Sequence, residues 1–379
     1  MFKYIRQRIL FALLALIIIS LFSYVLVAAF APNPVRALAE KLVSSPTNHR
    51  TYDEILKELE VQNGIRYGTL AEPGEYVPIL VRYFKYIGNI FRGNWGAIIN
   101  PDNNPNPGEY DTIPKLFFTP LKYSILVSAP AFLFSSVIGT SLGIYSGYKR
   151  GKLFDSFTNI FVLIFIALPS FIIAPIAITI AASMGILPEV PDLSSGLSGG
   201  AIFVAYLPPI IVVTLGSLAI YTTYSRNQVI TVLTSNYVLI AKSKGLSPKQ
   251  IFFKYVLRNI SIPIFALVFP SFLGLISGSI IVERFWNIKG TSQVIVYAFP
   301  SGEINIVMFS VLFFTLLSLV SEIITDISYA ILDPRITYGV ASKKNYWAFY
   351  KAYLFRKKLI KELLKSEVQT TNEKGIKNA

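Results

Sequence analysis

Long apolar runs alternate with shorter polar segments along most of the chain. A helix that crosses a membrane needs about 20 predominantly apolar residues, and six runs reach that length. They lie near Ile9–Phe30, Pro120–Tyr145, Phe157–Ser183, Val204–Tyr224, Ile264–Val282 and Ile304–Ile331. The pattern predicts an all-α, polytopic membrane protein with six transmembrane helices. We expect the first run to be retained, because it is longer than the roughly 7–15 residues of a signal-peptide core.

The polar segments divide the chain into four expected parts. Residues 1–30 hold an N-terminal tail and the first span, and residues 31–119 form an insertion outside the bilayer. Residues 120–335 contain the other five spans, with a loop at 225–262, and residues 336–379 form a basic tail.

Two of these parts also contain expected helices outside the bilayer. In the insertion, Thr51 is a suitable N-cap for a short helix over Tyr52–Val61, whereas Pro101–Gly108 is rich in turn residues. We expect the insertion to cap the outer mouth of the spans. In the tail, Tyr346–Lys365 is both aromatic and basic, which fits either a helix on the inner leaflet or a solvated tail.

Basic residues are distributed unevenly between the loops. Lys and Arg number three before the first span, three between the second and third, six in 225–262 and eleven after Leu332. The loops 184–203 and 283–302 hold none and two. Cytoplasmic loops collect Lys and Arg, so both termini are expected in the cytoplasm of a cell-membrane protein. The net charge of +14 is therefore a topology signal, and nucleic acid is not an expected partner.

Composition narrows the possible chemistry. The chain has 53% hydrophobic and only 15% charged residues, which excludes a soluble globule and a disordered chain. It has no Cys and one His, His49. A Cys-ligated zinc, an iron–sulfur cluster, a disulfide framework and a Cys nucleophile are therefore excluded. No metal or other cofactor is expected.

The loop 225–262 is specified in unusual detail. Asn236–Lys244 predicts a short helix, Gly245 suits the C′ position that needs a positive φ, and Leu246 can pack back on that helix. Ser247–Gln250 (SPKQ) supplies an N-cap, a proline at N1 and a capping box for a second helix. We expect the six cations of the loop to project outward. Such a corner fits a socket on another protein or an amphipathic hairpin on anionic lipid, and the residues alone leave both open.

The loop also carries an ordered set of residues, Tyr237-Val238, Ala241–Leu246, Leu257-Arg258-Asn259 and Pro263. This set resembles the conserved cytoplasmic loop of ABC-importer permeases, in the version typical of the oligopeptide/dipeptide/nickel family. The more widespread importer version has Glu-Ala-Ala where this chain has Leu239-Ile240-Ala241, and Pro where it has Arg258. Both departures are usual for the peptide-type subgroup.

Segments outside the loop add to the resemblance. They are Tyr83–Gly96, Ser141–Gly147, Leu168–Phe171, Gly278–Phe285 and Leu332–Arg335. The individual residues that match the family include Glu283, Gly290, Asp326, Asp333, Pro334 and Arg335. Each segment alone is weak, but the ordered set covers most of the chain outside residues 31–76.

The resemblance implies the fold of a type I ABC-importer permease, with a coupling helix in the loop that sits in a cleft of an ATPase. It also implies the partners, which are two ABC ATPase subunits, a sister permease subunit and an extracytoplasmic substrate-binding protein. Gly245 would set the corner, and Lys242 and Lys244 would meet acids or carbonyls on the ATPase. The apolar contacts would be Tyr237, Ala241 and Leu246. Peptides are the default substrate of the family, although similar permeases also carry sugars.

A chain that hydrolysed ATP would carry a Walker A loop of the form GxxxxGK[ST]. The nearest segment, Gly147–Leu153 (GYKRGKL), has a different spacing and no hydroxyl. Leu197–Gly200 (LSGG) imitates the ABC signature, but we interpret it as a glycine-rich turn. We therefore expect a transport subunit and not an enzyme.

Two other classes of function stay open. An ion- or proton-coupled secondary transporter needs ionisable groups inside the bilayer, and the sixth span has Glu322 and Asp326 one turn apart. Glu322 is the deeper of the two, and it fits a proton relay, a carboxylate paired with a helix end, or one facing a wet cavity. A membrane receptor or scaffold would explain the loop but not the similarity across six spans.

Glycines and prolines mark expected features of helix packing. Glycines recur every four positions in two separate sets, one of Gly139, Gly143 and Gly147 and one of Gly274 and Gly278. Such faces let helices approach closely in lipid, either within this subunit or against the sister permease. Pro169 and Pro175 predict a kink in the third span.

Overall fold

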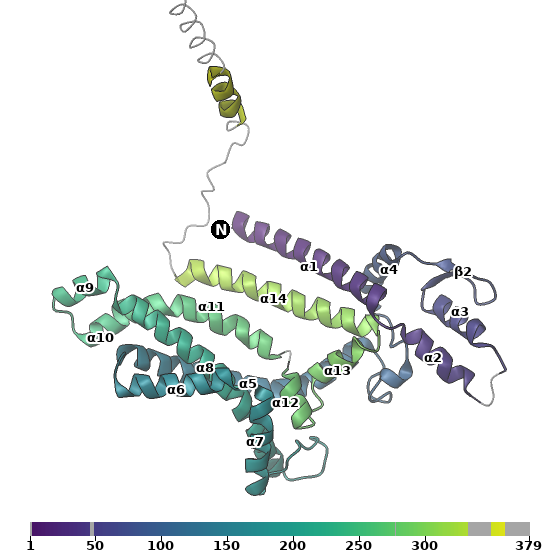
Figure 1. Cartoon of the computed structure of the whole chain (residues 1–379), viewed down its shortest axis with the longest axis horizontal. Helices are drawn as coiled ribbons and strands as arrows, with labels where there is room; N and C mark the ends of the chain where they lie inside the picture. The colour runs from purple at the N-terminus through teal and green to yellow at the C-terminus, as the bar shows by residue number, and fades with distance from the viewer. Residues whose placement is uncertain (1, 46–48, 277, 333–349, 361–379) are drawn as a thin grey trace, which may run out of the picture.

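The computed structural model describes residues 2–45, 49–276, 278–332 and 350–360, and most of these residues are helical (Figure 1). Among them, five helices are long and apolar enough to cross a membrane. They are α1 (Phe2–Phe30), α5 (Ile113–Tyr148), α8 (Gly199–Leu233), α11 (Leu257–Ile276) and α14 (Ile304–Leu332). The expected all-α, polytopic architecture is confirmed.

The third predicted span is a bent pair of helices. α6 (Leu153–Ala167) and α7 (Ser170–Ser183) meet at an angle of 103°. Leu168 and Pro169 between them are extended, with ψ angles of 115° and 144°. Proline has no N–H to donate and disfavours a helical conformation in the residue before it, so α6 ends here. The expected kink therefore lies at Pro169, whereas Pro175 is accommodated inside α7.

The fourth span is longer than predicted at both ends, because α8 begins before Val204 and ends after Tyr224. The hydroxyl of Ser198 accepts a hydrogen bond from the Ala201 N–H at 3.3 Å and caps the helix. The segment Leu197–Gly200 is therefore a helix start and not a glycine-rich turn.

The fifth predicted span, which was expected to run to Val282, ends early. α11 stops at Ile276, and a short helix, α12 (Ile280–Phe285), follows it. Gly278 between them has a φ of +80°, a backbone conformation that glycine adopts without strain. The chain then passes through α13 (Thr291–Ala298) before it enters α14.

α5 and α8 pack against each other at the centre of the bundle (Figure 1). Gly139, Gly143 and Gly147 line the face of α5 that contacts α8. A Cβ atom at Gly139 would lie 2.8 Å from the carbonyl oxygen of Leu218, and one at Gly143 would overlap the carbonyl of Thr222. The Thr222 hydroxyl donates to the Gly139 carbonyl at 3.1 Å. These contacts support packing within the chain for the three glycines.

The second pair of glycines does not form a packing face. A Cβ at Gly274 would meet nothing within 4 Å, and Gly278 lies outside the helices. Gly274 and Gly278 therefore do not form a common packing face within this chain, because α11 ends before Gly278. Packing of Gly274 against a sister permease stays a prediction. Gly278 instead borders the Glu283 side chain.

α1 and α14 lie side by side along the bundle, and α11 packs on α14 as well (Figure 1). Near the start of α1, Arg8 Nε lies 2.9 Å from a carboxylate oxygen of Asp326. Asp326, one of the residues that match the family in sequence, therefore joins these two helices.

Residues 31–45 and 49–112 form a small mixed unit at one end of the bundle, and residues 113–119 of the expected insertion belong to α5 instead (Figure 1). Its elements are α2 (Pro34–Val43), α3 (Tyr52–Gln62), the antiparallel strands β1 (Arg66–Gly68) and β2 (Pro73–Tyr76), α4 (Ile79–Phe91) and the 3-10 turn η1 (Pro101–Asn103). The predicted helix after Thr51 is confirmed, and Thr51 and Glu54 form a capping box. The hairpin was not predicted, because its strands have only three and four residues.

Hydrogen bonds attach this unit to the bundle through α4 and through the segment before η1. The hydroxyl oxygens of Tyr83 in α4 and Ser20 in α1 lie 2.8 Å apart. Farther along the chain, the Glu303 carboxylate accepts hydrogen bonds from the N–H groups of Ile99 and Asn100 at 2.9 and 2.7 Å. Glu303 is fully buried in the corner before α14, and this burial raises its pKa.

The opposite end of the bundle carries a helical hairpin (Figure 1). It consists of α9 (Asn236–Ser243), α10 (Pro248–Ile251) and a π-helical turn, η2 (Phe252–Val256), that runs directly into α11. Beyond α14, residues 350–360 are helical and exposed. The rest of the helix expected over Tyr346–Lys365 lies outside the described residues.

Candidate functional site

The corner of the helical hairpin is closed by backbone hydrogen bonds. Gly245 has a φ of +76°, and its N–H donates to the Lys242 carbonyl at 2.9 Å. The N–H of Leu246 donates to the Ala241 carbonyl at 3.2 Å. Together these two bonds form a Schellman motif, as the sequence predicts. A side chain at Gly245 would be strained by its φ although no neighbour crowds it.

The second helix of the hairpin starts directly after this corner. The Ser247 hydroxyl accepts from the N–H of Gln250 at 3.4 Å, and the Gln250 side chain accepts from the N–H of Ser247 at 2.9 Å. Pro248 occupies the first helical position. The predicted capping box is therefore confirmed, and it fixes the direction in which α10 leaves the corner.

The hairpin has a core of its own, which it shares with the end of α8 and the start of α11. The buried residues of this core are Val229, Val232, Val238, Ala241, Ile251, Val256 and Ile260. Leu246 is half-buried and packs against them. Ala241 is only 2% exposed, so its side chain is not available as the outward contact that we expected. The core fixes the hairpin to two of the long helices.

The outward surface of α9 comes from positions on the other side of that helix. Because Val238 and Ala241 point into the core, Leu239 and Ile240 point away from it and are 52% and 54% exposed. Tyr237 is exposed as well. The sequence analysis did not predict Leu239 and Ile240 as outward contacts, although the inward spacing of Val238 and Ala241 is the signal that would have identified them.

The cations of the loop do not all project outward. Lys242 and Lys244 are exposed beside the apolar surface of α9, as expected. Arg226, however, belongs to α8 and binds Asp155 of α6 through hydrogen bonds of 2.6 and 2.8 Å. The expectation of six outward cations is therefore wrong for Arg226. Asp155 was missed from the sequence because nothing local links it to a partner in α8.

A second cluster of polar side chains surrounds Glu283 where the fifth span is interrupted. Glu283 is 2% exposed, and its carboxylate accepts from the Ser124 hydroxyl at 2.7 Å and from both the N–H and the hydroxyl of Ser292. A Cβ at Gly278 or Gly290 would overlap this carboxylate. The sequence predicted Glu283 and Gly290 separately, and the structure brings them together with Gly278 around one buried carboxyl group.

The acidic residues of α14 occupy different environments. Asp326 is the partner of Arg8, whereas Glu322 is exposed on the outside of the described bundle. This exposed position of Glu322 does not favour any of its three interpretations, the proton relay, the pairing with a helix end or the wet cavity. Asp333, Pro334 and Arg335 lie outside the described residues. Within the described part of the chain, no group of three or more His, Cys, Asp or Glu side chains could hold a metal ion.

Comparison with known families identifies the chain. The family described as binding-protein-dependent transport system inner membrane component matches residues 139–338, which is more than half of the sequence. The chain belongs to this family. The matched region contains the hairpin α9–α10, both glycines that border Glu283, and the α6–α8 ion pair.

Curated members of the family resemble the chain beyond that region. It is 29% identical over 337 residues to the oligopeptide transport system permease protein OppB of Mycoplasma genitalium, covering 89% of this chain and 77% of that protein. OppB of Haemophilus influenzae is 28% identical over 341 residues, covering 89% of this chain and all of that protein. The dipeptide transport system permease protein DppB of Lactococcus lactis is 28% identical over 260 residues, covering 68% of this chain and 81% of that protein. Coverage of 89% means that the two OppB alignments include part of residues 31–119.

Proteins of this family are membrane components of transport systems. The apolar helices of the described structure agree with a multi-pass membrane protein.

Proposed function

We propose that the chain is the transmembrane permease subunit of an ATP-driven importer of peptides. Its family membership and the names of its OppB and DppB relatives support this function. The proposed complex contains two ABC ATPases, a sister permease subunit and an extracytoplasmic binding protein. ATP hydrolysis occurs on the ATPase subunits in this proposal.

The proposed orientation has both termini and the hairpin α9–α10 in the cytoplasm, with residues 31–119 outside. The hairpin α9–α10 and the unit before α5 lie at opposite ends of the bundle (Figure 1). The loop 225–262 carries six Lys and Arg residues and no acid, and positive charge of this kind favours the cytoplasmic side.

The observation that carries the proposal is the way the hairpin joins the spans. α9 follows α8 after only Thr234 and Ser235, and η2 continues into α11 without a break. A displacement of α9 is therefore passed to two membrane helices through a shared apolar core. The exposed surface of Tyr237, Leu239 and Ile240, flanked by Lys242 and Lys244, is the proposed contact with the ATPase. When ATP closes the ATPases, the hairpin moves with them and the spans change from inward-open to outward-open.

Site-directed cross-linking tests this assignment, because the chain has no Cys. Leu239→Cys, in the assembled complex with its two ATPases, is expected to cross-link to an ATPase. Leu70→Cys is the matched control, because Leu70 is equally exposed at 53% but lies in the loop between β1 and β2, at the opposite end of the bundle. Ala241→Cys, which is buried, is expected to cross-link poorly.

The outcomes separate the alternatives. A Leu239→Cys complex that imports peptide and hydrolyses ATP without any cross-link to the ATPase would contradict the proposed contact. Cross-linking of Leu70→Cys to the ATPase would reverse the proposed orientation. Labelling of Leu239→Cys only by lipid-soluble reagents would instead favour a hairpin on the membrane surface.

A further inference from the structure

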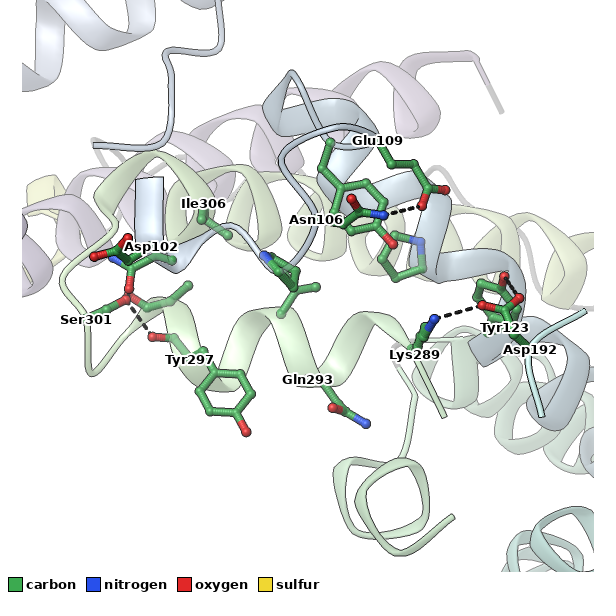
Figure 2. Close-up of a pocket in the computed structure, with 17 residues that line it drawn as sticks. Asp102, Asn106, Glu109, Tyr123, Asp192, Lys289, Gln293, Tyr297, Ser301 and Ile306 are labelled. Atoms are coloured by element: carbon green, nitrogen blue, oxygen red, sulfur yellow. Dashed lines mark hydrogen bonds and ion pairs between the residues drawn. The ribbon is translucent and has the colours of Figure 1, made fainter. Parts of the chain in front are cut away.

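A cavity of about 410 Å³ lies between the unit that precedes α5 and the core of the bundle (Figure 2). One wall comes from the loop after η1, including Glu109 and Tyr110, and the other from α13 and the residues just before it. Three carboxylates line the cavity, those of Asp102, Glu109 and Asp192. Lys289 is the single cation among the described residues that line it.

A second cavity of about 220 Å³ adjoins the first, and the two share Tyr123, Asp192 and Lys289. Tyr206 lines this second cavity and is 6% exposed, but its hydroxyl has no hydrogen-bond partner among the described residues. A buried hydroxyl without a partner is unfavourable, and a polar ligand in the cavity would supply one.

An ion pair stands between the two cavities. Lys289 Nζ lies 2.7 Å from one carboxylate oxygen of Asp192, and the Tyr123 hydroxyl donates to the other at 3.1 Å (Figure 2). The hydrogen bond from Lys289 lowers the pKa of Asp192, and the same contact raises the pKa of Lys289, so both groups are charged at neutral pH. The Lys289 side chain is 65% exposed, and an ion pair this open to water contributes little net stability. A ligand with its own charges can therefore exchange with it.

The three carboxylates differ in their partners. Asp102 pairs with Lys41 at 2.6 Å, and Asp192 pairs with Lys289. Glu109 accepts a hydrogen bond from the Asn106 amide at 3.0 Å, and no cation of the described chain lies within ion-pair distance of it. The cavity thus offers one carboxylate without a cation among the described residues and one exposed cation, Lys289, with which a ligand carboxylate can pair in place of Asp192.

We propose that the two cavities bind a peptide with free termini, whose carboxylate pairs with Lys289 and whose ammonium group pairs with Glu109 or with the released Asp192. The Tyr206 hydroxyl is available to hydrogen-bond the peptide in the second cavity. Aromatic and apolar side chains, among them Tyr110 and Val294, line the first cavity as well and can accept side chains of different kinds. This inference rests on the proposed function, because it concerns the same transported peptide.

Peptides with blocked termini test the proposal in the complete complex, reconstituted in vesicles with its ATPases, sister permease and binding protein. The probes are trialanine, trialanine amide and N-acetyl-trialanine. Lys289→Gln is expected to reduce the ratio of trialanine to trialanine-amide import by about tenfold, because one charge-assisted contact to the carboxylate is lost. Lys115→Gln is the matched control, since Lys115 is an exposed lysine that also pairs with an aspartate, Asp111, at 2.8 Å.

The binding protein is the same in every assay, so a change in this ratio between variants arises in the permease. Lys289→Arg keeps the charge and is expected to restore the ratio, which separates recognition from misfolding. Glu109→Gln is expected to reduce the ratio of trialanine to N-acetyl-trialanine import instead. An unchanged trialanine-to-amide ratio in Lys289→Gln would overturn the proposed site while leaving peptide import intact. If the wild-type complex imports none of the three peptides, the proposed function itself fails, and the site fails with it.

Discussion

Asp155 and Arg226 are 71 residues apart in the sequence, yet two hydrogen bonds of 2.6 and 2.8 Å join their side chains. The Ser146 hydroxyl and the Gly151 N–H also donate to Asp155, at 2.6 and 2.9 Å. The carboxylate thereby connects the end of α5, the start of α6 and α8 at a single point. Because α8 leads into the hairpin, this ion pair holds the helices through which the proposed movement of the hairpin passes.

Removing the cation of this pair should be strongly destabilising. Arg226→Ala leaves the buried Asp155 charge without its partner, and breaking a buried pair in this way costs about 3 kcal/mol. We expect the thermal midpoint of the purified complex to fall by several degrees. Arg226→Lys keeps the positive charge but not the bidentate hydrogen bonding, so its thermal midpoint should lie between those of wild type and Arg226→Ala. Equal stability of Arg226→Ala and wild type would contradict the structural role of the pair.

Close packing of α5 on α8 predicts different responses from two glycines. Gly143→Ala places a Cβ against the Thr222 carbonyl, and we expect a loss of about 1–3 kcal/mol in unfolding free energy. Gly216 also lies in a membrane helix, α8, but a Cβ there meets nothing within 4 Å, so Gly216→Ala should be neutral or slightly stabilising. Thermal unfolding of the two variants in the same detergent measures the difference. A larger loss at Gly216 than at Gly143 would mean that the helices do not pack as described.

The polar cluster around Glu283 predicts a loss of function from a conservative change. Glu283→Gln places an amide N–H₂ near the N–H and hydroxyl of Ser292 or the hydroxyl of Ser124, where acceptors are required. Leaving a buried polar group without its hydrogen-bond partner costs about 1–3 kcal/mol, and we expect peptide import to fall at least tenfold. Glu75→Gln, an exposed carboxylate in β2, is the control and should import at the wild-type rate. Wild-type import by Glu283→Gln would show that the interruption of the fifth span does not depend on this carboxyl group.

Burial of Glu303 predicts a dependence of stability on pH. Burial raises the pKa of Glu303 above its ordinary value of 4.5, so between 4.5 and the raised pKa the folded chain binds a proton that the unfolded chain has lost. Stability from this group is therefore highest below pH 4.5 and declines as pH rises through that window, by up to about 1.4 kcal/mol per pH unit. The difference in thermal midpoint between wild type and Glu303→Gln, measured from pH 4 to pH 8, should shift against the wild type as pH rises. A difference that does not change with pH would contradict the assignment.

Local signals in the sequence were sufficient for much of the fold and for the hairpin. Spans can be predicted because a lipid-facing helix must be apolar over its whole length. The corner at Gly245 and the caps at Thr51 and Ser247 can be predicted because each depends on residues within one helical turn. The structure of these elements is determined by a few residues that are neighbours in the sequence.

The errors concern contacts between residues that are distant in sequence. Gly278 continues the four-residue spacing from Gly274, yet its role is to leave room for Glu283 in a turn. Ala241 matches the family motif, yet its side chain belongs to the core shared with α8 and α11. The partner of Arg226 lies in a different helix, so counting charges along the loop assigned it to the wrong surface. Glu303 gave no signal, because its hydrogen-bond donors, the N–H groups of Ile99 and Asn100 and the side-chain amide of Asn103, lie about 200 residues earlier in the chain.

The pairing of α1 with α14 also has a consequence for biogenesis. The ribosome completes α1 long before it reaches Asp326, the residue that binds Arg8. Until then, the early helix resides in the membrane without its eventual neighbour, and its outward side chains, such as Leu10 and Ile17, are apolar enough to remain in contact with lipid acyl chains. Docking of these two helices is therefore a late step of assembly, and a truncated product that stops before α14 would leave the arginine near the start of α1 without its aspartate.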